Sequence, residues 1–253
     1  MGNKSHKINL VVKYEYLIFN IIVLTGPLFF GSFKKFYFFN YWRPAIISIA
    51  FSAIPFIIWD IFVTNRHWYF ADKYTLGIRI FELPIEEIMF FITVPFACLF
   101  TWVMLNNFNN TNHKKYFTSE QTFDENFFIS VISVFFLFLI LISLIFKKEY
   151  TSISLTFLIG SIIFDKMFGA KIIRYKMFWI YLSIVSLFTL IFNGYLTWRP
   201  IVTYNEVYQI GFRIFTIPIE DFLFGYSLII FSTTIFEKKL KILNSISGLQ
   251  NNK

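Results

Sequence analysis

Long apolar runs divide the chain into seven candidate membrane spans. They lie near residues 14–33, 44–63, 84–105, 127–146, 152–168, 177–195 and 218–236. A helix needs about 17 to 25 apolar residues to cross roughly 30 Å of hydrocarbon, and these runs have that length. The fifth run is short and is interrupted by Asp165, so it is the weakest of the seven. The pattern predicts an all-α fold, a polytopic membrane bundle of about seven transmembrane helices.

The composition supports a membrane protein. Of the 253 residues, 57% are hydrophobic and 15% are charged, which is too apolar for a soluble domain of this length. The net charge of +8 comes mostly from Lys and Arg in short connections and the tail, where such residues orient membrane proteins, so no nucleic acid partner is needed. We expect an integral, multi-pass protein of a bacterial-type cell membrane, surrounded by lipid, whose first helix is a retained anchor.

Several common kinds of site have no signature in the sequence. Cys98 is the single cysteine and lies in an apolar run, so we expect it to pack. His6, His67 and His113 are scattered and do not have the spacing of a zinc site. The sequence contains no G-x-G, the core of the dinucleotide fingerprint, and no P-loop. We therefore expect neither a metal nor a nucleotide cofactor.

One segment of the sequence occurs twice. "GIRIFELPIEEIMFF" (Gly77–Phe91) and "GFRIFTIPIEDFLFG" (Gly211–Gly225) share Gly, Arg, Ile, Phe, Pro, Ile, Glu and Phe at a constant offset, the one that takes Gly77 to Gly211. Upstream, "DIFVTNR" (Asp60–Arg66) matches "NGYLTWR" (Asn193–Arg199). The second and third spans thus correspond to the sixth and seventh. This displacement predicts an internal parallel repeat, with both repeated segments on the same side of the membrane.

The repeat suggests a division of the chain into four parts. Residues 1–106 form a first module, 107–150 a polar loop and a linker span, 151–237 a second module, and 238–253 a polar basic tail. Once the four arginines of the repeated segments are set aside, the distribution of Lys and Arg favours a cytoplasmic C-terminus. The sequence leaves the oligomeric state open, including a homo-oligomer.

Each module places two acids side by side at the start of an apolar run. These acids are Glu86 and Glu87 in the first module, and Glu220 and Asp221 in the second. The helix dipole favours an acid in the first turn by about 0.3–1 kcal/mol, but it does not explain an adjacent pair or the repeated Gly-x-Arg-Ile-Phe upstream. Ionisable groups in membrane helices are costly and tend to face the bundle interior, where they mark a site. We therefore interpret all four acids as catalytic candidates.

Aromatic rings lie close to the acids along the helix. Glu86 and Phe90 are four residues apart, as are Glu220 and Phe224, so each pair shares a helix face. A carboxyl group among rings loses hydration and can be held as a neutral acid. With 23% Phe, Trp and Tyr, the chain is also suited to a cavity that tolerates a cation, because ring faces stabilise positive charge.

Six further polar residues of the two modules are candidates for supporting roles: Asp60, Thr64, Arg79, Asn193, Thr197 and Arg213. The threonine follows the aspartate or asparagine by four residues, so each pair can form a polar patch or simply bond its own helix end. Each arginine would favour the ionised form of whichever carboxylate it pairs with. Asp60 ranks above Asn193 because only Asp60 can ionise.

These segments resemble the membrane-embedded lycopene cyclase domain, a family that occurs as two small subunits or fused into one chain. The resemblance covers about residues 10–237 and is carried by "WDIFVT" (Trp59–Thr64), "LGIRIFELPIEEIMFF" (Leu76–Phe91), "NGYLTWRPIVTY" (Asn193–Tyr204) and "IGFRIFTIPIEDFLFG" (Ile210–Gly225). The doubled Pro-x-Glu-(Glu/Asp) motif in this setting is specific. The chain looks like a fused homologue of the heterodimeric type.

The resemblance implies a lycopene β-cyclase, an isomerase that acts as an intramolecular lyase. Its substrates would be lycopene and other C40 polyenes within the bilayer, and its products β-carotene or γ-carotene, formed without a cofactor. The acids of the family map onto Glu86, Glu87, Glu220 and Asp221. Asn193 replaces the aspartate found at Asp60, which implies that the two halves differ in chemistry.

Two other functions stay open at this point. A small membrane transporter would use the acid pairs as ion or proton sites, and a carotenoid hydratase would let water capture the cation. A prenyltransferase is disfavoured because Asp60 and Asp165 are solitary and cannot form an Asp-rich magnesium cluster. A retinal protein is disfavoured because the last span has no Lys, and Lys238 lies beyond it.

Overall fold

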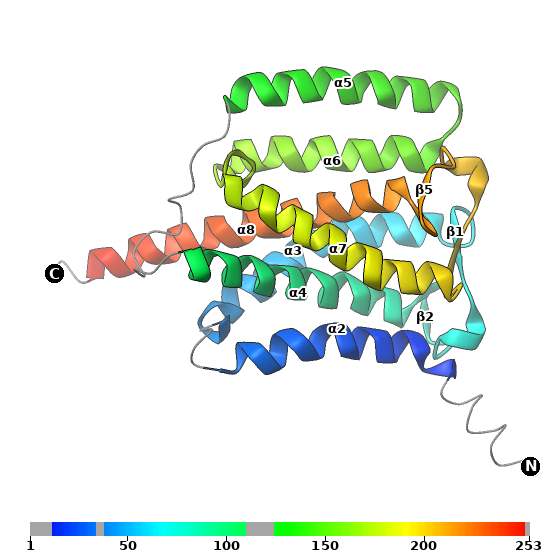
Figure 1. Cartoon of the computed structure of the whole chain (residues 1–253), viewed down its shortest axis with the longest axis horizontal. Helices are drawn as coiled ribbons and strands as arrows, with labels where there is room; N and C mark the ends of the chain where they lie inside the picture. The colour runs from blue at the N-terminus through cyan, green and yellow to red at the C-terminus, as the bar shows by residue number, and fades with distance from the viewer. Residues whose placement is uncertain (1–11, 34–37, 110–123, 251–253) are drawn as a thin grey trace, which may run out of the picture.

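The computed structural model describes residues 12–33, 38–109 and 124–250. Within these residues it contains seven α-helices: α2 (Glu15–Gly31), α3 (Trp42–Val63), α4 (Ile85–Asn109), α5 (Glu125–Ile145), α6 (Glu149–Phe168), α7 (Lys176–Trp198) and α8 (Ile219–Gln250). Six of the helices are long and apolar enough to cross a membrane, and α2 is slightly shorter. The helices lie side by side along the long axis of the molecule, with α7 oblique to the others (Figure 1). The predicted all-α membrane bundle is confirmed.

The ends of the helices follow from local sequence. The carboxylate of Asp124 accepts the backbone N–H of Asn126 at 2.9 Å and so caps the start of α5. Gly169, with φ of 77°, ends α6 in the left-handed conformation that glycine adopts without strain. The fifth apolar run, interrupted by Asp165, nevertheless forms a complete helix. The last helix continues through Gln250, well beyond the apolar run that predicts it.

The two connections that carry the repeated sequence have the same structure. In the first, β1 (Trp68–Phe70) and a 3-10 turn (Asp72–Tyr74) precede a hairpin of β2 (Arg79–Ile80) and β3 (Leu83–Pro84). The second has the same order: β4 (Val202–Tyr204), a 3-10 turn (Glu206–Tyr208), β5 (Arg213–Ile214) and β6 (Ile217–Pro218). Gly77 and Gly211 have φ of 83° and 82°, which explains why this glycine occurs in both copies. The repeated sequence therefore corresponds to a repeated backbone.

A short antiparallel ribbon joins the two modules. Strands β1 and β4 pair in the register Trp68↔Tyr204, Tyr69↔Thr203 and Phe70↔Val202. Both connections therefore lie at the same end of the bundle, where β1, β2 and β5 are drawn (Figure 1). The predicted parallel sense of the repeat is confirmed.

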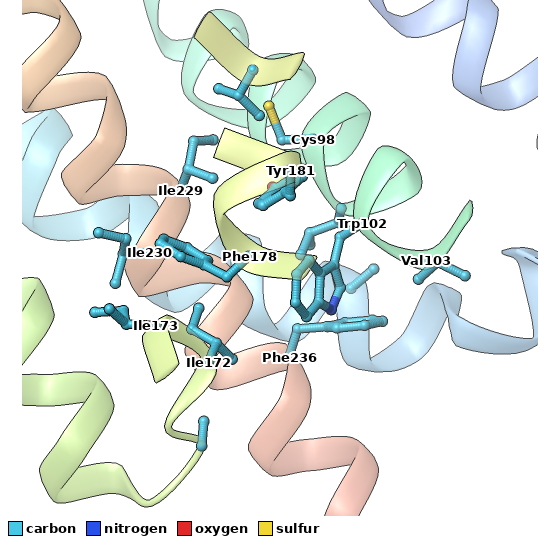
Figure 2. Close-up of a cluster of buried hydrophobic side chains, with 14 of the residues drawn as sticks. Cys98, Trp102, Val103, Ile172, Ile173, Phe178, Tyr181, Ile229, Ile230 and Phe236 are labelled. Carbon is cyan, nitrogen blue, oxygen red and sulfur yellow. The ribbon is translucent and has the colours of Figure 1, made fainter. Parts of the chain in front are cut away.

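The helices pack in an order that also reflects the repeat. Helix α2 packs on α4 and α6 packs on α8, while α3 contacts both α4 and α8. Helix α5 lies at the periphery against α6 (Figure 1). One buried cluster, toward the end opposite the connections, contains Trp102, Phe178, Tyr181 and Phe236 (Figure 2). Cys98 is buried in the same cluster, in the packing role expected of it.

Candidate active site

Only one acid of each adjacent pair faces the main cavity of the described chain. This cavity has a volume of about 360 Å³, and Glu87, Asp221 and Asp60 lie in its wall. The relative exposure of Glu87 and Asp221 is 9% each, whereas that of Glu86 and Glu220 is 0%. The volume falls within the range of pockets that bind small molecules. Of the four paired acids, Glu87 and Asp221 are therefore those that a molecule in the cavity can reach.

Glu86 and Glu220 instead hold the two connections in place. The Oε1 atom of Glu86 accepts the backbone N–H of Leu76 at 2.6 Å, and that of Glu220 accepts the N–H of Ile210 at 2.8 Å. Each bond reaches back by the same interval within its own module. The hydroxyl of Thr151 also donates to Glu220 at 2.6 Å. The structure thus places these glutamates beneath the loops, outside the cavity wall.

Asp221 accepts three hydrogen bonds. Its donors are the hydroxyl of Tyr150 at 2.5 Å, the hydroxyl of Tyr204 at 2.5 Å and the amide Nδ2 of Asn193 at 2.8 Å. Burial, together with the neighbouring Asp221, raises the pKa of Tyr204 well above its ordinary value, so the phenol keeps its proton and stays a donor. Three donated hydrogen bonds favour a negative charge on Asp221.

Glu87 has a different environment. It accepts a hydrogen bond from the hydroxyl of Tyr16 and lies close enough to Asp60 for the two charges to interact. Asp60 accepts the indole N–H of Trp68 at 2.6 Å, but its Oδ2 atom is buried without a hydrogen-bond partner among the described residues. Two neighbouring buried carboxyl groups resist carrying charge together. Glu87 therefore has a second carboxyl group as a neighbour, whereas Asp221 is surrounded by hydrogen-bond donors.

The rest of the cavity wall is mainly apolar and aromatic. Phe90 and Phe224 lie in it, together with Glu87 and Asp221. From the carboxyl groups the wall continues along α2, α4 and α7 to three exposed side chains: Ile22, Phe30 and Phe188. We call this opening the lateral mouth, because it lies on the side of the bundle between α2 and α7. Acids thus line a cavity that opens toward lipid.

The two arginines of the repeated motif stabilise the hairpins. Arg79 donates to the carbonyl of Glu82 at 2.7 Å, and Arg213 donates to the carbonyl of Thr216 at 2.8 Å. Arg79 also pairs with the carboxylate of Asp72 at 2.6 Å. Among the described residues, the carboxylates that lie near Arg79 and Arg213 therefore belong to the two connections. Their repetition reflects the repeated hairpin.

The two threonines bond their own helix ends. The hydroxyl of Thr64 donates to the backbone carbonyl of Asp60 at 2.8 Å, and that of Thr197 donates to the carbonyl of Asn193 at 3.1 Å. Of the two interpretations left open by the sequence, these bonds correspond to the structural one. Asp60 and Asn193 both reach the cavity, as expected of supporting residues.

Four aromatic hydrogen-bond donors to the acids were missed in the sequence. They are Tyr16, Trp68, Tyr150 and Tyr204. A signal was present, because the dipeptide Glu-Tyr occurs at residues 15–16 and again at 149–150, with the same offset that relates Gly77 to Gly211. Tyr16 bonds Glu87, and Tyr150 bonds Asp221, so each tyrosine bonds the second acid of a pair. Because the chain contains many aromatic residues, this repeated Glu-Tyr dipeptide does not stand out in the sequence.

Two ion pairs connect the modules reciprocally. Arg199 donates to Glu15, at the start of α2, at 2.7 Å, and Arg66 donates to Glu149, at the start of α6, at 2.5 Å. The guanidinium of Arg199 also lies over the ring of Tyr74. The modules are therefore related by an approximate two-fold arrangement around the cavity.

One family of known proteins matches two segments of this chain. The model of the family described as lycopene cyclase matches residues 13–105 and 147–238. The first match contains α2, α3 and most of α4, and the second contains α6, α7 and the apolar part of α8. Helix α5 lies between the two matches. Searches of curated proteins and of solved structures gave no match.

Proposed function

Because the chain belongs to the lycopene cyclase family, we propose that it converts lycopene, within a bacterial-type cell membrane that its helices cross several times, into β-carotene or γ-carotene. The family match supports a carotenoid cyclase role. One observation carries the finer proposal: Glu87 and Asp221 face the same aromatic cavity, which opens at the lateral mouth. The substrate, the β-ionone ring and the direct roles of these two acids are parts of the proposal.

The proposed reaction moves protons without any net oxidation. A neutral carboxyl group adds a proton to the terminal double bond of the polyene and leaves a tertiary carbocation. The neighbouring internal double bond supplies the electron pair for the new carbon–carbon bond, which moves the positive charge into the ring. A carboxylate then removes a ring proton and restores a double bond. One proton enters and one leaves, so the product is an isomer of the substrate.

We assign the proton donor to Glu87 and the base to Asp221. Asp60 stands beside Glu87, so this pair holds a proton, whereas Asn193 donates a hydrogen bond to Asp221 and favours its charge. Pairs of carboxyl groups in unlike environments are the usual way in which a site divides acid and base work. The remaining two acids, Glu86 and Glu220, act as positioning residues through the loops.

The aromatic wall protects the intermediate. Ring faces stabilise a nearby cation by about 0.5–2 kcal/mol each, and Phe90, Phe91 and Phe224 all line the cavity. Excluding water matters because water would capture the cation as an alcohol. A C40 polyene is itself dissolved in lipid, so the lateral mouth admits it without passage through water.

Expression in lycopene-accumulating cells tests the function most directly. We expect a shift in colour and absorption spectrum, with cyclised product identified by chromatography and mass spectrometry. Unchanged lycopene alongside well-expressed membrane protein would contradict the proposal and favour a transporter. A product bearing a hydroxyl group would identify a hydratase.

Cyclisation in D₂O tests the mechanism. A donor carboxyl group that exchanges with solvent should leave one deuterium in each ring formed, with no oxygen added. Unlabelled rings would exclude a solvent-exchanging acid as the proton source. Mass spectrometry of the purified carotenoid distinguishes these results.

A further inference from the structure

The bundle has a second, apolar hollow on another side. It is lined by side chains of α3, α6 and α8, among them Phe56, Phe157, Gly160, Phe164 and Phe231. Met167, also in its lining, is 81% exposed, so the hollow is open to the outside. Among the described residues no acid lies in its wall, and the reaction proposed above makes no use of it.

This hollow occupies the position in the second module that the lateral mouth has in the first. Gly160 and Phe164 of its wall are the counterparts of Gly26 and Phe30 of the mouth, at the offset that relates Gly77 to Gly211. By the same offset, Phe231 is the counterpart of Ala97, a residue of the cavity wall. The duplication therefore gave two openings, one beside α2 and one beside α6.

Three rings close the second opening from the inside. The ring centroids of Phe56 and Phe157 are 4.8 Å apart, those of Phe56 and Phe224 are 4.8 Å apart, and those of Phe157 and Phe224 are 5.2 Å apart. Phe224 also faces the cavity with the carboxyl groups, whereas Phe56 and Phe157 face the hollow. We call these three residues the ring plug.

The cavity has smaller side chains at the two positions that correspond to the plug. Phe157 corresponds to Val23, by the offset that relates Gly160 to Gly26. Phe56 corresponds to Thr189, by the offset that relates Asp60 to Asn193. Both Val23 and Thr189 line the open cavity. The difference between an open and a closed passage therefore lies in two side chains.

We propose that the second hollow is a closed copy of the substrate entrance, and that the ring plug makes the cavity blind, so that one end of a C40 polyene enters only between α2 and α7. The proposal rests on the proposed cyclase function. The ring plug fixes how far the end of the polyene enters the cavity, and therefore which double bond meets the acids. To form a product with two rings, the polyene must leave the cavity and enter again with its other end.

A matched pair of glycine variants tests the use of the openings. An added Cβ would meet nothing within 4 Å at either Gly26 or Gly160, so Gly26→Trp and Gly160→Trp start from backbone positions with matched clearance. We expect Gly26→Trp to reduce ring formation by about tenfold or more, since obstructing substrate position commonly costs that much. Gly160→Trp should leave the rate within about twofold of the wild-type rate, as expected of a substitution outside the substrate path.

The ring plug is tested in the Gly26→Trp variant, in which the lateral mouth is obstructed. Adding Phe56→Thr and Phe157→Val to Gly26→Trp should restore ring formation several-fold, and adding Gly160→Trp as well should remove the gain. Phe56 is fully buried, so Phe157→Val alone, at a half-buried position, serves as a second variant if the double substitution fails to fold. Monodisperse elution in detergent verifies folding.

The outcomes separate this proposal from the function on which it rests. Wild-type protein that does not cyclise lycopene contradicts the function. Active wild-type protein with equal effects of Gly26→Trp and Gly160→Trp overturns the single entrance. If Phe56→Thr and Phe157→Val fold but do not restore ring formation in the Gly26→Trp variant, the three rings are not what closes the second opening.

Discussion

The two modules have the same order of helices and strands but different chemistry beside their cavity-facing acids. In the first, Glu87 has the carboxyl group of Asp60 as its neighbour; in the second, Asp221 has the amide of Asn193. A second difference has the same direction, because Tyr204 donates to Asp221 while the corresponding residue of the first module is Phe70. In the proposed mechanism, both changes favour a charge on Asp221 and a proton on the pair of Glu87 and Asp60. If that mechanism holds, two substitutions are enough for a duplicated scaffold to supply both an acid and a base.

The largest effect is expected from removing an acid that faces the cavity. Glu87→Gln and Asp221→Asn should each reduce ring formation by about 10² to 10⁴, the range of general acid or base catalysis. Product per unit of membrane protein is the measurement. Glu86→Gln is the matched control, because it changes the adjacent residue, which bonds a loop and lies outside the cavity wall.

The outcome for the control decides the roles within each pair. The side-chain amide introduced by Glu86→Gln would still accept the N–H of Leu76, so a loss well below that of Glu87→Gln is expected. Equal losses at both positions would mean that the first acid of the pair also takes part in proton transfer.

An intermediate effect is expected from making the modules more alike. Tyr204→Phe gives the second module the residue that the first has at Phe70, and removes a hydrogen bond to Asp221. A bond to a charged group contributes about 1.5–3 kcal/mol, so ring formation should fall by roughly 10- to 100-fold. Phe70→Tyr is the reciprocal control. Unchanged activity in Tyr204→Phe would show that Asp221 does not need this donor.

A smaller and equal effect is expected at the shared glycine of the connections. Gly77→Ala and Gly211→Ala each force a side chain into a left-handed backbone conformation with free space around it. The cost is about 1–2 kcal/mol of stability at either site. Thermal unfolding in detergent measures it. A much larger loss at one glycine would show that the two connections carry unequal shares of the stability.

The smallest effect is expected from the reciprocal ion pairs. The Arg66–Glu149 pair is exposed and the Arg199–Glu15 pair is partly exposed, and such pairs contribute little because water and salt screen them. Arg66→Ala and Arg199→Ala should each lower the unfolding temperature slightly, and by similar amounts. A large decrease for one variant alone would show that the approximate two-fold arrangement is not energetically balanced.

The sequence predicts the architecture well, because length, hydropathy and the repeat are properties of the chain itself. It does not show which acid of each pair faces the cavity. Neighbouring residues on a helix point about 100° apart, and only the packing of α2 and α6 against α4 and α8 decides between them. Tyr16 illustrates the same limit, because its partner Glu87 lies on a different helix, far along the chain.

The arginines show the opposite error. Arg79 and Arg213 look like partners for the acids because they recur in the same motif, yet each bonds a carbonyl of its own hairpin. A repeat preserves everything that the local backbone needs, in addition to anything that the chemistry needs. Recurrence alone therefore cannot separate a catalytic residue from a loop residue.

Helix α5 acquires a meaning from its position between the matched segments. Each module contributes three helices. A chain that crosses the membrane once in each helix leaves three helices on the side opposite to the one where it entered. A direct fusion would turn the second module upside down, so β1 could not meet β4 and the two carboxyl groups would lie at opposite ends. Few residues of helix α5 are buried, yet this one additional crossing gives the second module the same orientation as the first. We expect that its sequence can be replaced by almost any apolar helix, but that it cannot be deleted.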